Sequence, residues 1–126
     1  MRILIVDDVA MHRELLEICI AREPGHKVTS VASGEEALRV LQESGHRFDI
    51  VFLDINMPIL NGLQVLEQLR ESPLHRSLQI VMCSTRNDMP TITKALEMGA
   101  KHYLFKPCTR TGVAQKLQQI ARLIHA

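Results

Sequence analysis

The sequence predicts an α/β fold built on a five-stranded parallel sheet with helices on both faces. Short apolar runs alternate with longer segments of helical period, and the runs cover residues 3–6, 27–32, 50–53, 80–83 and 103–105. Several runs are almost wholly apolar, which is typical of strands that are covered on both faces in a parallel sheet. Strand and helix therefore alternate along the chain, and right-handed crossovers are expected to connect the strands.

The segments between the runs carry signals for the beginning and end of helices. Ser33 and Glu36 have the spacing of a capping box ahead of an apolar face over residues 37–41. A later helix is predicted to begin at Asn87 or Asp88, which are good N-cap residues, and to end at Gly99. The last segment is predicted to be helical because its apolar residues fall on one stripe: Val113, Leu117, Ile120, Ala121 and Ile124.

The length and charge of the chain limit the classes of protein to which it can belong. Its 126 residues match one domain, and we expect a single domain over residues 1–126 with no effector domain besides it. A formal net charge of +1 gives no electrostatic basis for direct nucleic acid binding or for binding to an anionic membrane. The apolar runs are too short to span a bilayer and the N-terminus lacks a secretion signal, so a cytoplasmic protein is expected.

The cysteines and histidines do not form a recognisable metal or disulfide pattern. Cys19, Cys83 and Cys108 are odd in number and widely spaced, which resembles neither a disulfide framework nor a zinc site. We expect them to be small buried residues in a reducing compartment. The six histidines also lack metal-ligand spacing, and most are expected at the surface.

Polar side chains follow four of the predicted strands, at the edge of the sheet where ligands bind in open parallel sheets. Each one alone is weak evidence, because an Asp after a strand often caps a helix and a Ser or Thr there is often a turn residue. Together they bring three carboxylates, two hydroxyls and one ammonium to one edge. The residues are Asp7 and Asp8 after the first strand, Asp54 after the third, Ser84 and Thr85 after the fourth, and Lys106 after the fifth.

Such a group of residues suits phosphoryl transfer. Three neighbouring carboxylates repel one another, so either one takes up a proton or a cation binds among them. Hard carboxylate oxygens with open positions favour Mg²⁺, which completes its shell with water and phosphate oxygens. A cation and a lysine ammonium offset the charge of a transferring phosphoryl group, and an aspartate beside them serves as the nucleophile.

These residues resemble, in order and in spacing, the signature of the receiver domain of two-component response regulators. The resemblance covers essentially the whole chain and rests on Asp7-Asp8, Asp54, Met57-Pro58 with Gly62, Ser84 and Lys106-Pro107. It implies a doubly wound five-stranded parallel sheet in the flavodoxin-like order 2-1-3-4-5, with helices on both faces. The nearest comparison in size is the single-domain chemotaxis regulators.

The resemblance also implies a role for each residue of the acidic edge. Asp54 would accept a phosphoryl group from a phosphohistidine of a sensor histidine kinase or a histidine phosphotransfer protein. Asp8, Asp54 and the backbone carbonyl of Asn56 would bind Mg²⁺ directly, while Asp7 would act mainly through water. Lys106 would contact the phosphoryl group and would be joined to the next residue by a cis peptide bond.

The same resemblance implies a switch and an output. Ser84 would hydrogen-bond to the phosphoryl group and Tyr103 would be the aromatic that moves with it. The face formed by the fourth helix, fifth strand and fifth helix would then bind a downstream protein or an effector domain absent from this chain. The domain would be no enzyme beyond assisting its own phosphorylation and dephosphorylation. Thr85 departs from the small residue usual after the switch hydroxyl and is expected to affect rates, as are Asn56 and Arg86.

Three other interpretations remain open. A phosphatase of the haloacid-dehalogenase type also uses an aspartate nucleophile with Mg²⁺, but it needs an acidic residue where this chain has Asn56. A flavodoxin needs a Ser/Thr-rich phosphate loop where this chain has residues 7–10, Asp-Asp-Val-Ala. A receiver-like scaffold that is never phosphorylated is disfavoured by the complete acidic set together with Ser84 and Lys106.

Overall fold

A single parallel sheet forms the centre of the protein. The structure, a computed structural model, describes residues 1–44, 48–73 and 77–125. Within these residues five parallel strands lie in the order β2-β1-β3-β4-β5. The strands are β1 (Arg2–Val6), β2 (Lys27–Val31), β3 (Ile50–Asp54), β4 (Gln79–Ser84) and β5 (His102–Phe105). The predicted strand order is therefore confirmed, and the strand positions agree to within a residue or two.

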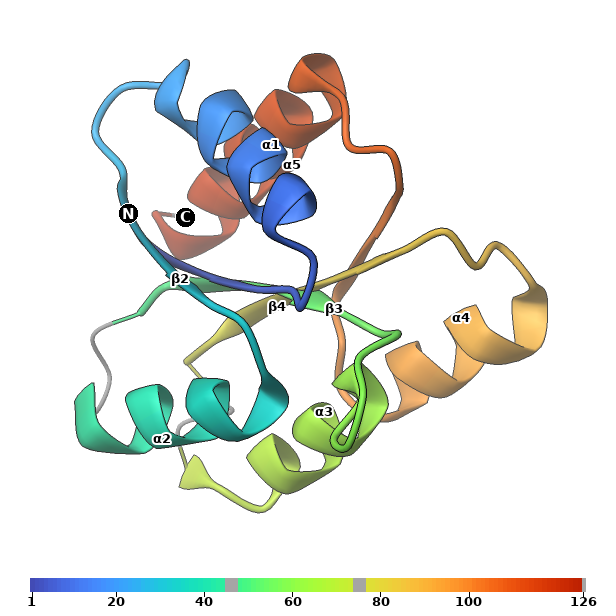
Figure 1. Cartoon of the computed structure of the whole chain (residues 1–126). Helices are drawn as coiled ribbons and strands as arrows, with labels where there is room; N and C mark the ends of the chain where they lie inside the picture. The colour runs from blue at the N-terminus through green and yellow to red at the C-terminus, as the bar shows by residue number, and fades with distance from the viewer. Residues whose placement is uncertain (45–47, 74–76, 126) are drawn as a thin grey trace.

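Helices cover both faces of this sheet, as predicted for a doubly wound fold. They are α1 (Ala10–Ala21), α2 (Gly34–Ser44), α3 (Gly62–Arg70), α4 (Met89–Glu97) and α5 (Arg110–Ile124). Helices α1 and α5 lie side by side on one face, and α2, α3 and α4 lie on the other (Figure 1). Every strand is followed by a helix, so the carboxyl ends of the strands and the beginnings of the helices meet at one edge.

Two separate hydrophobic cores hold the layers together. Successive side chains of a strand point to opposite faces, and β1 shows the consequence. Ile3 and Ile5 pack under α1 and α5, whereas Leu4 and Val6 pack over α2, α3 and α4. All four side chains are buried. Strand β3 is buried along its whole length, which explains why its sequence reads as a continuous apolar run.

The helix ends follow the sequence signals with two refinements. Asp88, one of two candidate caps, begins α4 by accepting a hydrogen bond from the Thr91 backbone N–H at 3.1 Å. Ser33 caps α2 by accepting from the Glu36 N–H at 3.1 Å, but the Glu36 carboxylate reaches back to the N–H of Ala32 instead of closing the box on Ser33. The predicted capping-box spacing therefore gives the cap, with its second hydrogen bond displaced by one residue.

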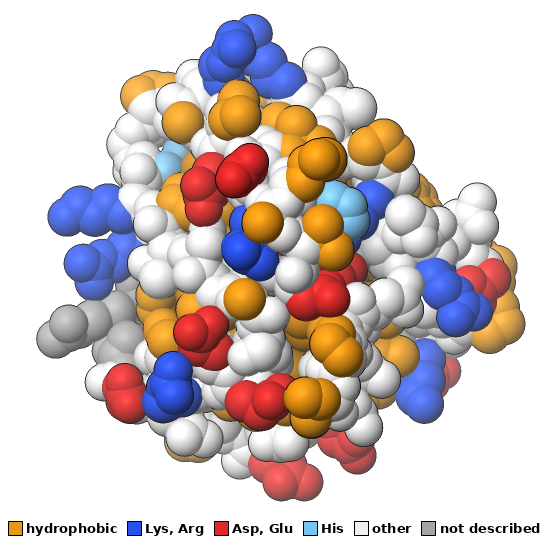
Figure 2. All heavy atoms as spheres, in the orientation of Figure 1, with side chains coloured by type: hydrophobic (Ala, Val, Ile, Leu, Met, Phe, Trp, Pro, Cys, Tyr) orange, Lys and Arg blue, Asp and Glu red, His pale blue; other side chains and the backbone are white. Residues whose placement is uncertain are grey.

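The surface has a mixed character. Figure 2 shows acidic and basic side chains interspersed on the face that carries α1, together with several exposed hydrophobic side chains. Met11, Leu15 and Ile18 of α1 are among the exposed hydrophobic residues. Among the histidines, His102 is buried, and one of its ring nitrogens lies 3.1 Å from the Gln79 side-chain oxygen. In the described part of the chain, the helices are too short or too polar to cross a bilayer.

Candidate functional site

The acidic side chains meet at the carboxyl ends of the neighbouring strands β1 and β3. Asp7 and Asp8 directly follow β1, and Asp54 is the last residue of β3. Each of the three offers a carboxylate oxygen, and these oxygens lie within 4.8 Å of one another. Asp7 and Asp54 are buried, with only 1% and 4% of their surface exposed, whereas Asp8 is exposed. Hard oxygen ligands with one open side fit the preference of Mg²⁺.

Lys106 neutralises part of the charge that these carboxylates carry. Its Nζ donates to Asp7 Oδ2 at 2.6 Å and to Asp54 Oδ1 at 3.0 Å. Burial by itself lowers the pKa of Lys106, but the hydrogen bonds to the two carboxylates outweigh it, so the pKa is raised. The ammonium therefore stays charged near neutral pH and is fixed beside Asp54.

Asp54 is the carboxylate whose protonation the site perturbs most clearly. Burial raises the pKa of Asp54, the hydrogen bond from Lys106 opposes the rise, and the charge of Asp7 adds to it. A second cation beside Asp54 would favour the ionised form that a nucleophile requires. The local electrostatics thus suit a site that is completed by a divalent cation.

His12 belongs to this site, and the sequence analysis missed it. It lies in the first turn of α1, where its Nδ1 lies 3.0 Å from Lys106 Nζ and 3.4 Å from Asp7 Oδ2. The signal was available, because a helix that follows β1 begins at the same edge of the sheet as the carboxylates. Searching the histidines only for metal-ligand spacing overlooked this relation.

Gly62 allows the chain after β3 to fold back against Asp54. A Cβ added at this position would lie 2.1 Å from the Asp54 backbone oxygen and 2.8 Å from the Ile55 Cα. The Gly62 N–H donates to the Ile55 carbonyl at 2.9 Å, which closes the turn that precedes α3. Asn61 then caps α3 through a reciprocal pair of hydrogen bonds with Gln64. The glycine of the resemblance is therefore required by close packing beside the candidate phosphorylation site.

Ser84 on β4 and Tyr103 on β5 both hydrogen-bond to the backbone of Arg86. Ser84, at the end of β4, is fully buried, and its Oγ accepts a hydrogen bond from the Arg86 N–H at 3.0 Å. The hydroxyl of Tyr103 on β5 donates to the Arg86 carbonyl at 2.9 Å. Burial raises the pKa of Tyr103, while a hydrogen bond with Ser84 lowers it. Tyr103 therefore contacts the segment between β4 and α4 instead of the carboxylates.

A small cavity opens beside Asp54. It has a volume of about 150 Å³. Asn56 and Thr85 are both exposed and both line it, so their side chains stand beside the space next to Asp54. The peptide bond between Lys106 and Pro107 is cis, as the resemblance implied. The other residues that line the cavity are Asp8, Val9, His12, Asp54 and Lys106.

Comparison with known proteins agrees with the fold. Residues 3–118 match the family described as the response regulator receiver domain. The chemotaxis protein CheY of Thermotoga maritima is 30% identical over 122 residues, which cover 96% of this chain and 98% of that protein. The chain therefore belongs to the response regulator receiver family. This assignment sets aside the phosphatase and flavodoxin interpretations.

Solved structures and longer relatives extend the comparison. The chemotaxis protein CheY4 of Vibrio cholerae superposes with a TM-score of 0.85 at 27% identity, covering 94% of this chain and 97% of that one. The transcriptional regulatory protein AfsQ1 of Streptomyces coelicolor is 33% identical over 95% of this chain, which spans only 50% of that relative. A protein-glutamate methylesterase/protein-glutamine glutaminase of Desulfotalea psychrophila is 33% identical, with 92% of this chain and 32% of the relative aligned. The chain thus spans about a third to a half of these longer relatives.

Proposed function

We propose that this receiver domain accepts a phosphoryl group on Asp54 from a phosphohistidine of a sensor histidine kinase or a histidine phosphotransfer protein. The observation that carries the proposal is the Asp54 carboxylate, which lines a cavity and has Lys106 and two further carboxylates around it. The chain contributes acceptor chemistry and assists the gain and loss of its own phosphoryl group. It has no other catalytic role in this proposal.

The transfer is a displacement at phosphorus. An Asp54 carboxylate oxygen attacks the phosphorus, the P–N bond to the donor imidazole breaks, and the imidazole nitrogen keeps the electron pair and takes up a proton. Lys106 is already fixed beside Asp54 and offsets negative charge on the transferring group. Asp7, Asp8, Asp54 and the Asn56 carbonyl would hold Mg²⁺, which supplies further charge compensation to the phosphoryl oxygens when it is bound.

In this proposal the partner binds to a different part of the surface from the site of phosphorylation. The added group brings up to two negative charges and three acceptor oxygens to the edge of the sheet. Ser84 and Lys106 are the donors proposed to meet them, and the face of α4, β5 and α5 is proposed to change with Ser84 and Tyr103. Met89, Leu96 and Phe105 are exposed hydrophobic residues of this face and offer a binding surface.

The partners follow from this arrangement. The phosphodonor must bring a phosphohistidine to the cavity beside Asp54, and the output is a downstream protein or an effector domain outside residues 1–126. We propose that residues 1–126 act as one receiver domain, in the cytoplasm where such kinases present their phosphohistidines. A partner controls the switch only if it binds the two states with different affinity.

The decisive experiment is labelling of the acceptor. Incubation with Mg²⁺ and acetyl phosphate, followed by intact-mass spectrometry, should show one added phosphoryl group on the parent and none on Asp54→Asn. Asp8→Ala should lose labelling and Mg²⁺ affinity together, because it removes a direct oxygen ligand. Equal labelling of Asp54→Asn refutes the acceptor assignment, and unlabelled parent protein in the presence of a competent donor supports a scaffold that is never phosphorylated.

A further inference from the structure

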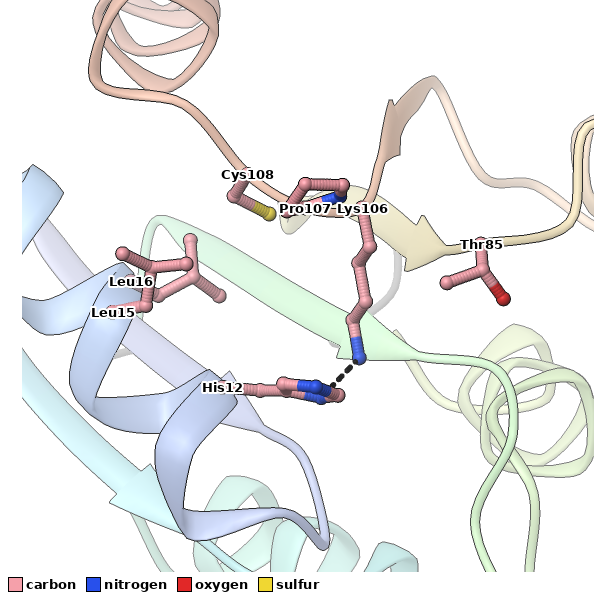
Figure 3. A pocket seen from close by; sticks show the side chains of 7 residues that line it. All are labelled: His12, Leu15, Leu16, Thr85, Lys106, Pro107 and Cys108. Atoms are coloured by element: carbon pink, nitrogen blue, oxygen red, sulfur yellow. Dashed lines mark hydrogen bonds between the residues drawn. The ribbon is translucent and has the colours of Figure 1, made fainter.

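The ammonium of Lys106 has a third close neighbour besides the two carboxylates. Its Nζ lies 3.0 Å from His12 Nδ1, as near as it lies to Asp54 Oδ1. Figure 3 shows the two side chains pointing toward each other, His12 from α1 and Lys106 from the connection that follows β5. An ammonium has three N–H groups to donate. Asp7, Asp54 and His12 therefore match its donors in number.

The chemistry of the two groups gives this contact a direction. A lysine ammonium has no lone pair, so it can donate a hydrogen bond but cannot accept one. A hydrogen on His12 Nδ1 would therefore face the N–H groups of Lys106 across 3.0 Å. Its alternative acceptor, Asp7 Oδ2, lies 3.4 Å from Nδ1, beyond the usual range of about 2.7–3.2 Å. The distances favour a lone pair on Nδ1 that faces Lys106.

The first turn of α1 fixes His12 beside Asp7. The Val9 N–H donates to Asp7 Oδ1 at 2.9 Å, and the His12 N–H donates to the Val9 carbonyl at 3.0 Å. The Arg13 side chain donates to the Asp7 carbonyl at 2.7 Å. The His12 side chain is 43% exposed, whereas that of Lys106 is only 9% exposed. His12 can therefore be substituted without opening the core, although it touches a buried charge.

The space on the other side of His12 suits an ammonium poorly. His12 and Lys106 both line a cavity of about 180 Å³, together with apolar side chains such as Leu15, Leu16 and Pro107. A buried N–H of a charged group that lacks an acceptor is costly. Without the imidazole, the third N–H of Lys106 would depend on water, and the ammonium could turn between its two carboxylates.

We propose that His12 is a positioning residue for phosphoryl transfer, which accepts one N–H of Lys106 and thereby aims another at Asp54. This inference rests on the function proposed above. The ionic partners of Lys106 change when the site is loaded, because Mg²⁺ draws on their charge and Asp54 forms a bond to phosphorus. The imidazole lone pair stays the same, since no bond to His12 forms or breaks in the transfer. His12 thus keeps the ammonium in the reactive position throughout the reaction.

Two variants of matched shape test the acceptor at His12. Asparagine branches at Cγ as histidine does and can place its amide oxygen where Nδ1 lies, whereas leucine has the same branching and no lone pair. With acetyl phosphate and saturating Mg²⁺, we expect His12→Leu to be labelled on the order of tenfold more slowly than the parent. His12→Asn should stay within about threefold of the parent rate. A parent-like rate in His12→Leu, or equally slow labelling of both variants, refutes the positioning role.

The affinity for Mg²⁺ separates positioning from a general disturbance of the edge. His12 is no ligand in this proposal, so amide NMR titration with Mg²⁺ should give the same affinity for both variants and the parent. Loss of affinity in His12→Leu in parallel with its rate would overturn the proposal. The control Met11→Ala changes the preceding residue, which is 75% exposed, and should be labelled like the parent.

Nitrogen-15 NMR tests the hydrogen bond itself, with no phosphodonor present. In the parent we expect His12 to carry its hydrogen on Nε2 and none on Nδ1. The Lys106 ammonium should give a signal in slow exchange with water, which is lost in His12→Leu and kept in His12→Asn. A hydrogen on Nδ1 refutes the contact, whatever the labelling rates. Parent protein that shows the hydrogen bond and yet takes no label refutes the proposed function and leaves the contact standing.

Discussion

The substitution Lys106→Met removes the ammonium that two buried carboxylates share. In the parent, Lys106 Nζ lies 2.6 Å from Asp7 Oδ2 and 3.0 Å from Asp54 Oδ1, and only 9% of the Lys106 side chain is exposed. Methionine keeps most of the apolar stem and loses the charge. The carboxylates then face each other without the charge that held them, in a place that water reaches poorly.

The expected cost follows from this burial. Removing one partner of a buried ion pair destabilises a protein by about 3–5 kcal/mol. Proton uptake by Asp54 limits the loss, since burial already raises its pKa, so we expect the lower end, about 3 kcal/mol without divalent cations. Bound Mg²⁺ at a hundredfold excess over its Kd stabilises by about 2.7 kcal/mol. The variant should bind Mg²⁺ more tightly than the parent because no ammonium competes with the cation. Mg²⁺ should therefore narrow the difference in the free energy of unfolding between the variant and the parent.

Urea denaturation at pH 7 measures both the loss of stability in the variant and the stabilisation by Mg²⁺. The parent, Lys106→Met and the control Lys101→Met are compared in EDTA and in MgCl₂. Lys101 is exposed in the turn before β5, so its substitution should change the free energy of unfolding little in either buffer. Equal stability of Lys106→Met and the parent in EDTA refutes the electrostatic account of the site. No rise in the free energy of unfolding of either protein in MgCl₂ refutes cation binding among the carboxylates.

Three further substitutions probe the same edge. Burial raises the pKa of Asp54, so the folded state binds the Asp54 proton more tightly, and the free energy of unfolding should fall as pH rises from the ordinary carboxyl range through the raised pKa. Asp54→Asn in EDTA should remove that fall. A urea midpoint that depends on pH in the same way in the variant and the parent contradicts this prediction. Gly62→Ala places a Cβ 2.1 Å from the Asp54 carbonyl oxygen and should cost about 1–3 kcal/mol in urea denaturation, with slower labelling; parent-like values contradict the packing argument. Ser84→Ala should still be labelled, but its amide NMR shifts with beryllofluoride should stay near Asp54, and long-range shifts equal to those of the parent exclude a hydroxyl-driven switch.

The sheet and its acidic edge were accessible from sequence because both depend on position along the chain. A buried parallel strand needs a continuous apolar run, and β3 is buried throughout. Residues that directly follow such strands must share one edge, whatever the details of packing. Asp7, Asp8 and Asp54 therefore could be placed together before their side-chain positions were known.

The features that the sequence did not predict depend on how side chains pack in three dimensions. His12 reaches Lys106 only because its face of α1 turns toward the edge, and one helical position either way would point it elsewhere. Cys83 and Cys108 are far apart in the sequence and enter one core because β4 and the connection into α5 pack under the same helices. The choice of Asp88 over Asn87 as the cap of α4 is equally local, because both residue types serve well.

The segment between β4 and α4 gives a physical route from Asp54 to the proposed output face. Both backbone groups of Arg86 are held by hydroxyls, its N–H by Ser84 and its carbonyl by Tyr103, and its side chain donates to Asp88 at 2.9 Å. If Ser84 turns its oxygen to a phosphoryl group, the Arg86 N–H loses its acceptor. The remaining hydrogen bonds then pull on Tyr103 and on the cap of α4 together. A partner that contacts α4 and β5 would then bind the two states with different affinity.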